Sequence, residues 1–357
     1  MDNYTCYRRL LLPRAAAVKA GAPRRLGLLV KWEFNRHFLV FMHLIRGFSR
    51  LPAFDGGCLL TIGNFDGLHL GHQHLINRIA EQGLSRGLPT VAMVFEPQPL
   101  EFFLGEHAPS RLTRLREKAI QFAKHPIDYL LVAPFNQQLA LYDPEQFVRE
   151  LLVNKLKIRH LVVGDDFHFG KARRGNFALL RHMGEQFGFA VENTESLELD
   201  GSRVSSTLIR DALQAGRLDE AKRMLGRDYS VCGRVGHGAK RGRELGFPTA
   251  NVRMFRKNTP VSGVFAVTLT GLNGEEHNGV ANVGIRPTVE GGPLVWLETH
   301  LFDFDRDIYG CYVEVHFKRK IRDERRFESL TALRRQIAED VAYAREVLPA
   351  PMPRQIG

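Results

Sequence analysis

The stretch CLLTIGNFDGLHLGH at residues 58–72 passes from a largely apolar run at 58–62 into a glycine-rich turn and then into a helical pattern. A short, continuous apolar run is typical of a strand that is buried on both faces. Leu75, Ile76 and Ile79 follow at helical spacing. The sequence therefore predicts a strand, a turn and a helix in this order.

The same alternation continues along the chain. Apolar runs at residues 90–95, 129–132, 160–163 and 190–192 are separated by segments that include helical patterns around 145–155 and 177–187. Buried strands that alternate with helices favour a parallel sheet covered on both faces. We therefore expect an α/β domain with a parallel sheet.

A different pattern begins near Tyr229. Val313, Val315 and Phe317 alternate with polar neighbours, and Asn273-Gly274 and Gly291-Gly292 are turn signals. These features predict a small antiparallel β-barrel. A final apolar stripe at helical spacing predicts a C-terminal helix that packs against the barrel. Its members are Phe327, Leu330, Leu333, Ile337, Val341 and Val347.

Composition narrows the class of protein. The chain has 357 residues, of which 44% are hydrophobic and 25% are charged. These values fit two globular domains and exclude a disordered, collagen-like or coiled-coil chain. No apolar run reaches the roughly 18–20 residues that a membrane span needs. The four cysteines form no Cys-x-x-Cys pair, so we expect no disulfide scaffold, no membrane partner and a cytoplasmic location.

The positive charge is concentrated at the N-terminus. Residues 1–41 carry eight basic and two acidic residues, which is +6 of the net charge of +11. This segment resembles a targeting peptide in composition only, and a loosely ordered extension or an upstream start ahead of Met42 is the simpler explanation. RNA binding is the alternative function from another class, but the sequence lacks the repeated aromatic and basic positions that a barrel needs to bind single-stranded RNA. We therefore expect no nucleic-acid partner.

The turn after the first strand predicts a phosphate site. A helix N-terminus presents free N–H groups and a partial positive charge to an anion. His69 and His72 are three residues apart, so both imidazoles can lie on one side of the first turn and stabilise charge in phosphoryl or nucleotidyl transfer. With His74 they could instead hold a metal ion, although no further ligand set is evident. Each histidine taken alone would more simply be structural.

Three further segments follow predicted strands. They are FEPQP at 95–99, GDDFHFG at 164–170 and VSSTLIR at 204–210. Ligands of open parallel sheets bind beyond the carboxyl ends of the strands. Turn prolines, loop acids and serine caps explain each segment singly, but together they favour a site.

A second glycine-rich region runs from GRVGHG at 233–238 to RGRELGFPTAN at 241–251. It does not match the Gly-x-x-x-x-Gly-Lys-Ser/Thr loop. From the residues alone, a mobile loop and a phosphate cradle are equally good interpretations.

These segments, with MHLIRG at 42–47 and GFPTAN at 246–251, resemble the bacterial bifunctional riboflavin kinase/FMN adenylyltransferases from about Met42 to about Leu348. The resemblance implies a Rossmann-like FMN adenylyltransferase domain at 42–225 and a riboflavin kinase domain, a β-barrel with a C-terminal helix, at 226–348. Residues 1–41 would be a poorly ordered extension and 349–357 a tail. The implied reactions convert riboflavin to FMN and FMN to FAD, with ATP and Mg²⁺ in both steps.

The resemblance also implies the adenylyltransferase residues. His69 and His72 would carry the ATP phosphates, and Arg210 would meet them through its guanidinium. The other residues implied to bind nucleotide or flavin are Gly63, Asn64, Phe65, Asp66, Gly71, Phe95, Pro97, Asp165, Asp166, Phe167, Ser205 and Ser206.

In the kinase domain, the resemblance implies that Thr249 and Asn251 help to hold Mg²⁺ and that Glu298 is the general base. Without the family match, Glu298 would be read as an exposed strand glutamate. The other implied binding residues are Gly238, Arg243, Gly246, Phe247, Pro248 and Arg286. Gly236 and Ile285 depart from the usual family pattern. A chain in which only one module is active is the remaining alternative.

Overall fold

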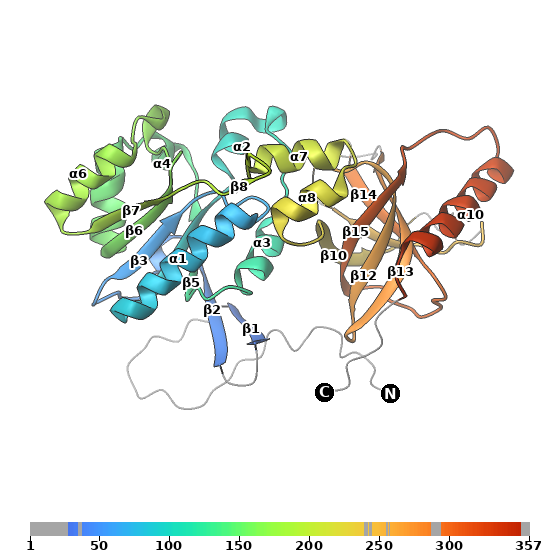
Figure 1. Cartoon of the computed structure of the whole chain (residues 1–357), viewed down its shortest axis with the longest axis horizontal. Coiled ribbons are helices and arrows are strands. Elements are labelled where there is room, and N and C mark those ends of the chain that lie inside the picture. Colours follow the sequence, from blue (N-terminus) through green and yellow to red (C-terminus); the bar gives the residue numbers. More distant parts are fainter. Residues whose placement is uncertain are drawn as a thin grey trace. The chain divides into compact units, whose positions relative to one another are not determined.

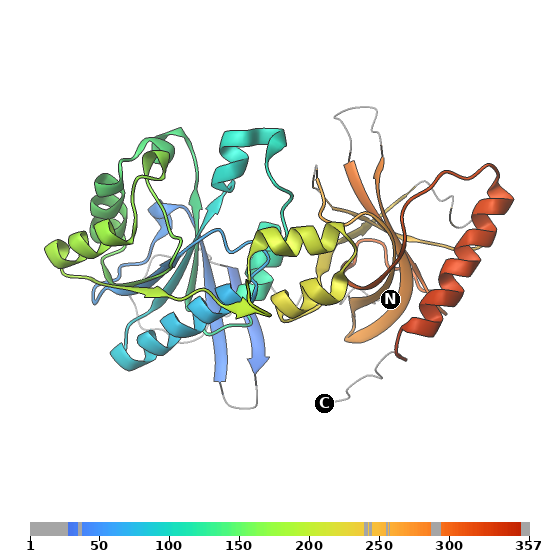
Figure 2. The same ribbon diagram turned by 45° about the horizontal axis from the view of Figure 1, so that its top comes forward.

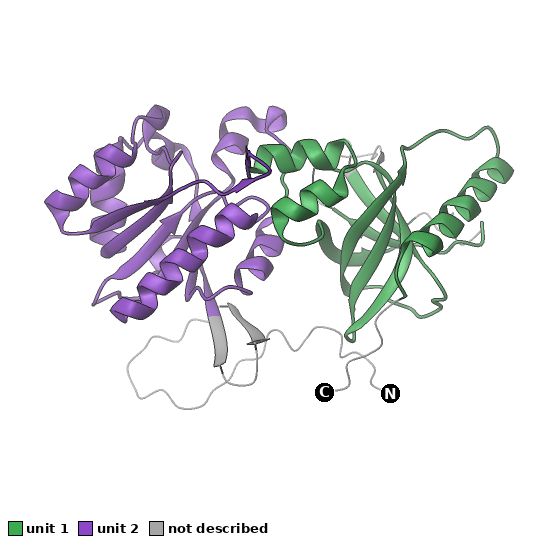
Figure 3. Cartoon of the chain, viewed as in Figure 1, with its two compact units in different colours: residues 1–9, 110–112, 205–357 green, residues 10–109, 113–204 purple. Residues whose placement is uncertain are grey.

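The computed structural model describes residues 28–34, 38–238, 242, 245–254, 256, 258–286 and 294–350, with the backbone alone at 28–34, 38–41, 285–286 and 294. The chain divides into two compact units, and each is described by itself (Figure 3). The first unit to be described, which Figure 3 labels unit 2 and draws in purple, contains residues 113–204 and the described residues before Ser110. The other contains residues 110–112 and the described residues from Ser205 onward.

The first unit is built on a seven-stranded sheet in the order β1-β2-β5-β4-β3-β6-β7 (Figure 1). Strands β2 to β7 are parallel, and β1 pairs with β2 in the antiparallel sense. The five predicted strands are confirmed, whereas β1 and β2 were not predicted. The strands are β1 (Leu28–Phe34), β2 (Phe38–Arg46), β3 (Cys58–Ile62), β4 (Thr90–Glu96), β5 (Tyr129–Pro134), β6 (Ile158–Gly164) and β7 (Ala190–Thr194).

Helices cover both faces of this sheet, because successive strand residues point to opposite sides. Leu59 packs with residues of α1 (Leu70–Arg86) and α3 (Leu115–Phe122). Leu60 packs with residues of the π-helix η4 (Phe147–Lys155) and of α6 (Phe177–Phe187). Two apolar cores therefore hold the strands between helical layers, as the continuous apolar runs predict. The remaining elements of this unit are η2 (Phe48–Arg50), α2 (Pro99–Leu104), η3 (Gly105–His107), α4 (Gln137–Leu141), α5 (Pro144–Gln146), η5 (Lys171–Arg173), β8 (Glu198–Leu199) and β9 (Ser202–Arg203).

The second unit contains a closed barrel of six strands in the order β10-β11-β14-β13-β12-β15. All of its neighbouring strands are antiparallel, which confirms the predicted barrel. Two helices precede it in the chain. The elements are α7 (Ser206–Gln214), α8 (Leu218–Leu225), β10 (Ser230–Gly236), β11 (Ala250–Arg253), β12 (Gly263–Leu272), β13 (Glu275–Arg286), β14 (Leu294–Leu301), β15 (Tyr312–Arg322) and α10 (Leu330–Val347).

The C-terminal helix α10 runs along the outside of the barrel (Figure 2). Ala344 and Leu348 belong to the same core cluster as barrel residues of β12 and β13, and Val341 and Val347 pack against it. This confirms the predicted packing of the helix. Leu330 was predicted on the buried stripe, but it is 71% exposed. The buried side includes Asp340 instead, so the stripe drawn from apolar residues alone was partly wrong.

Candidate active sites

The first candidate site lies where β3 passes into α1. His69 is the N-cap of α1, and its Nδ1 accepts a hydrogen bond from the backbone N–H of His72 (3.4 Å). The two imidazole rings stack with their centroids 3.6 Å apart. The spacing of three residues therefore brings both rings together, as predicted. His74 is exposed.

The loop before α1 is fixed by a buried carboxylate. Asp66 is 2% exposed and accepts a hydrogen bond from the backbone N–H of Thr113 (2.9 Å). The hydroxyl of Thr113 in turn accepts the N–H of Gly67 (2.9 Å). These bonds give Asp66 a role in shaping the turn. The ring of Phe65 contacts His72 edge to face at 5.1 Å.

His72 lies in a positive and partly desolvated environment. Burial, the neighbouring His69 and the ammonium group of Lys118 all lower its pKa well below the usual value. Its Nδ1 is buried and has no hydrogen-bond partner within the described part of the chain. A neutral imidazole beside a helix N-terminus can gain a proton or a donor role when an anion binds.

Lys118 was not among the predicted site residues. It lies on α3, is 1% exposed and donates from Nζ to the carbonyl oxygen of Asn64. A fully buried lysine is rare unless it is paired. Here its hydrogen bond supports the backbone of the loop, and its positive charge acts on His72. Asn64 itself is exposed.

Two further predicted segments lie at the same edge of the sheet as the histidine turn. β4, β3 and β6 are adjacent and parallel, so their carboxyl ends meet. Phe95 lies at the end of β4 and contacts Phe135, with ring centroids 5.7 Å apart, and Pro97 is exposed. Three of the four predicted segments, those at the ends of β3, β4 and β6, therefore lie at one edge of the sheet.

The acidic pair after β6 is bound by a neighbouring arginine. Arg203 Nη2 lies 3.3 Å from Asp165 Oδ1 and 2.8 Å from Asp166 Oδ2. Ser196 also donates to Asp165 (2.8 Å). Phe167 stacks on Phe169 at 5.7 Å. Arg203 was not predicted, because it is 37 residues from Asp166 in sequence.

The fourth predicted segment begins the second unit. Ser205 is the N-cap of α7 and accepts the N–H of Leu208 (3.2 Å), while Ser206 is the first residue of the helix. Arg210 donates from Nε to the carbonyl oxygen of Ser110 (2.6 Å). Capping explains the position of Ser205 without a ligand.

The second candidate site lies on one face of three barrel strands. Glu298 on β14 is directly opposite Asn251 on β11 and directly opposite Asn282 on β13. Cross-strand neighbours project from the same face of a sheet. Glu298 is half-buried rather than exposed. The amide nitrogen of Asn251 donates to the carbonyl oxygen of Thr249 (3.1 Å).

Tight packing surrounds these polar residues. A Cβ atom at Gly238 would lie 2.5 Å from Cγ of Asn251, so only glycine leaves room for this amide. The carbonyl oxygen of Pro248 lies 2.9 Å from Nδ1 of His300, and Phe247 meets the same imidazole edge to face. Gly246 is exposed. Arg243 and the side chain of Arg286, which were also predicted to bind ligand, lie outside the described residues.

No group of three or more histidine, cysteine or acidic side chains with metal-binding geometry is found among the described residues. Within the same residues, no helix is both long and apolar enough to cross a bilayer.

Two family models match consecutive parts of the chain, FAD synthetase at residues 51–208 and riboflavin kinase at residues 225–348. Proteins named bifunctional riboflavin kinase/FMN adenylyltransferase from Escherichia coli K12 and Haemophilus influenzae are 47% and 46% identical to 85% of this chain, covering 97% and 98% of their own lengths. A Pseudomonas fluorescens protein of that name is 47% identical over 87% of this chain and 99% of its own. A crystal structure described as a macrolide-efflux protein from Streptococcus pneumoniae has a TM-score of 0.73 at 27% identity, covering 86% of this chain and 99% of that one. The chain therefore belongs to the family of bifunctional riboflavin kinase/FMN adenylyltransferases.

Proposed function

We propose that this chain phosphorylates riboflavin to FMN on the barrel and then joins FMN to the AMP part of ATP, with release of pyrophosphate, in the α/β module. The observation that carries the kinase step is the cross-strand row in which Glu298 lies between Asn251 and Asn282. In this row, a carboxylate that can act as a base lies between two neutral side-chain amides.

In the kinase step, Glu298 takes the proton of the terminal ribityl hydroxyl. The hydroxyl oxygen then bonds to the γ-phosphorus of ATP as the bond to the ADP oxygen breaks. Family membership and the half-buried position of Glu298 opposite Asn251 support this role.

Thr249 and Asn251 are the residues that would hold Mg²⁺ with the ATP phosphates. Hydroxyl and amide oxygens are hard donors that suit this ion, and Mg²⁺ needs few protein ligands because it keeps waters and phosphate oxygens. The bond from the Asn251 amide nitrogen to Thr249 turns the nitrogen away and leaves the amide oxygen as a donor atom for the ion. When bound, the ion would neutralise charge on the transferring phosphoryl group.

In the adenylylation step, the N-terminus of α1 and the rings of His69 and His72 receive the triphosphate of ATP. A phosphate oxygen of FMN bonds to the α-phosphorus, and the bond to pyrophosphate breaks. No protein nucleophile is needed, so positioning and electrostatic stabilisation supply the rate enhancement. Arg210, Ser205 and Ser206 are proposed to contact phosphates in the same step.

The flavin and nucleotide of the adenylylation step are proposed to lie at the carboxyl edge of the sheet. Gly63 and Asp165 follow β3 and β6 there, and Phe95 lies near the end of the adjacent parallel strand β4. The paired acids Asp165 and Asp166 carry their own counter-ion in Arg203, so ligand binding would exchange partners within this cluster.

The test is to incubate purified protein with riboflavin and MgATP and to separate the flavins by chromatography. FMN should form first and FAD second. Glu298→Gln should stop FMN formation and leave the conversion of added FMN to FAD unchanged. Absence of both products from the unmodified protein would refute the proposed function. Equal loss of both steps in Glu298→Gln would refute the assignment of Glu298 to the kinase step alone.

A further inference from the structure

The side-chain amide of Asn282 has a fixed orientation. Its Nδ2 donates to Oε1 of Glu324 at 2.9 Å. A carboxylate can only accept hydrogen bonds, so the nitrogen must face Glu324 and the oxygen must point away from it. That oxygen, Oδ1, is buried and has no hydrogen-bond partner among the described residues. A buried acceptor without a donor is unfavourable unless a ligand supplies one.

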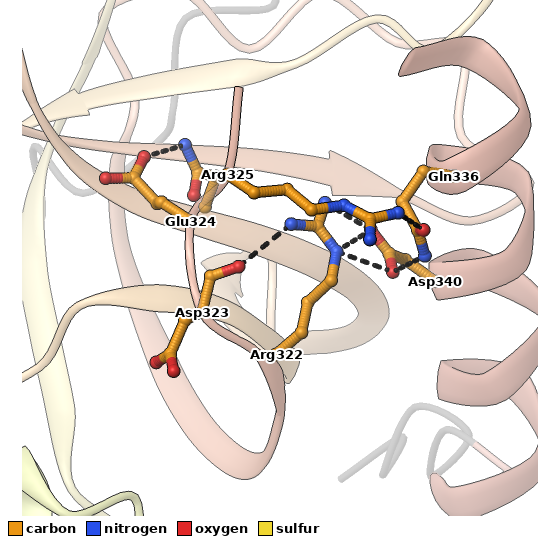
Figure 4. A network of polar contacts seen from close by, with 7 residues as sticks. Arg322, Asp323, Glu324, Arg325, Gln336 and Asp340 are labelled. Atoms are coloured by element: carbon orange, nitrogen blue, oxygen red, sulfur yellow. Dashed lines mark hydrogen bonds and ion pairs between the residues drawn. The ribbon is translucent and has the colours of Figure 1, made fainter. Parts of the chain in front are cut away.

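Two contacts constrain the chain around Glu324. It follows Arg322, whose guanidinium binds Asp340 on α10 through Nε and Nη2, at 3.0 and 2.8 Å (Figure 4). On the barrel side, the carboxylate lies against Gly284, where a Cβ atom would overlap it. The connection from β15 to α10 therefore presents Glu324 to β13 at a defined point.

Asn282 and Glu298 are direct cross-strand partners. Cβ atoms of such partners lie about 4.5–5.5 Å apart. A polyol whose terminal hydroxyl reaches Glu298 would therefore bring a neighbouring secondary hydroxyl to the Asn282 amide. A secondary hydroxyl is both a donor and an acceptor, and its O–H is the group that a buried amide oxygen lacks.

We propose that Asn282 Oδ1 accepts a hydrogen bond from a secondary hydroxyl of the ribityl chain, and that Glu324 is the positioning residue that orients the amide. This inference rests on the proposed kinase function. It assigns recognition of the polyol chain, as distinct from the ring system, to a residue opposite the base.

The test compares riboflavin with lumiflavin, which has the same ring system but no polyol chain. In the full-length protein, Asn282→Leu should raise the KM for riboflavin about tenfold, as expected for one lost hydrogen bond in a buried site. The kcat should change less than twofold. The Ki of lumiflavin as an inhibitor of riboflavin phosphorylation should stay the same.

Glu324→Gln is a second variant at an exposed position. Its neutral amide can donate or accept, so Asn282 is no longer held in one orientation and the KM should rise about threefold. Combined with Asn282→Leu, it should add nothing further. Glu328→Gln, at an exposed position of the same connection, is the matched control and should leave the KM unchanged.

Three results would overturn the proposal. They are an unchanged KM in Asn282→Leu, an equal rise in the riboflavin KM and the lumiflavin Ki, or fully additive effects of the two substitutions. A kcat for riboflavin phosphorylation that stays within twofold of the unmodified value reports that the barrel of each variant is folded. Failure of the unmodified protein to make FMN would instead refute the proposed function, so the two failures are distinguishable.

Discussion

Replacing Asp340 by asparagine should destabilise the barrel unit selectively. Asp340 is 2% exposed and lies on the barrel-facing side of α10. It accepts bonds from Arg322 and from Gln336 Nε2 (3.0 Å) (Figure 4). Asparagine keeps the shape but removes the charge and leaves the guanidinium without its counter-ion.

The magnitude follows from the burial of the two partners. Removing one partner of a buried pair costs about 3–5 kcal/mol. The side chain of Arg322 is 19% exposed, against 3% for Asp340. Water can therefore partly solvate the guanidinium of Arg322 once its counter-ion is removed. We therefore expect a loss of about 2–3 kcal/mol, at or just below the lower end of that range. For a unit of this size, that loss corresponds to a fall in Tm of roughly 6–10 °C.

The assay heats samples of the protein to a series of temperatures and then measures, in each sample, FMN formation from riboflavin and FAD formation from added FMN. The kinase step should be lost at the lower temperature, and FAD formation from added FMN should be less affected. Glu339→Gln is the matched control, because Glu339 is adjacent and pairs with Arg335 across exposed surface. A shift no larger in Asp340→Asn than in Glu339→Gln would refute the reasoning. Joint replacement by Arg322→Met and Asp340→Leu should recover much of the stability.

Three further outcomes are expected. His72→Asn should let FMN accumulate and lower FAD output by about 10²-fold or more. In the unmodified protein, ATP binding near pH 6 should take up a proton, because the phosphates raise the pKa of His72 that burial holds low. Calorimetry in two buffers that shows no proton uptake would count against this role. Lys118→Met should raise the KM for ATP in FAD formation about tenfold and leave riboflavin phosphorylation unchanged, and a change in both steps would indicate a general structural role instead. Burial acts to raise the pKa of Asp228, but hydrogen bonds from Lys318 and Lys222 hold it below its usual value. The stability that this carboxylate contributes at neutral pH should therefore be lost as the pH falls through that lowered pKa. In urea unfolding, the free energy of unfolding of Asp228→Asn should fall less steeply with decreasing pH than that of the unmodified protein.

The regular elements of the α/β unit could be predicted because each buried strand is a continuous apolar run. The predicted strand at 58–62 and the predicted helix at 177–187 have the observed bounds. β2 was not predicted, although Phe38–Arg46 is largely apolar. Its parallel neighbour is β5, and His43 pairs with Tyr129. The segment overlaps the basic stretch at residues 1–41, and that composition favoured an extension over a strand.

The buried side of α10 shows a different limit. Asp340, Ala344 and Leu348 recur at intervals of four and face the barrel. An aspartate on such a face cannot be found from apolar periodicity. Its partner Arg322 lies on the preceding strand, so the pair becomes visible only after the helix has folded back.

The candidate sites were predictable where a motif is local and not where a partner is distant. His69 and His72 lie in one turn, and their stacking follows from their spacing. Lys118 contacts Asn64 across 54 residues, and Glu324 contacts Asn282 across 42. Buried polar partners of this kind are specified by the fold, so they could not be read from the motifs.

Three glycines near the candidate sites are needed because of the side chains that pack against them. Gly71, Gly238 and Gly284 all have ordinary backbone angles, outside the region that favours glycine, but a Cβ atom would crowd His69 at 3.3 Å, Asn251 at 2.5 Å, and Glu324. Each glycine therefore makes room for a polar side chain that the proposed chemistry uses. Because the backbone at these three positions suits any residue, alanine there would displace one side chain without breaking the turn, and the loss would appear in the step that this side chain serves.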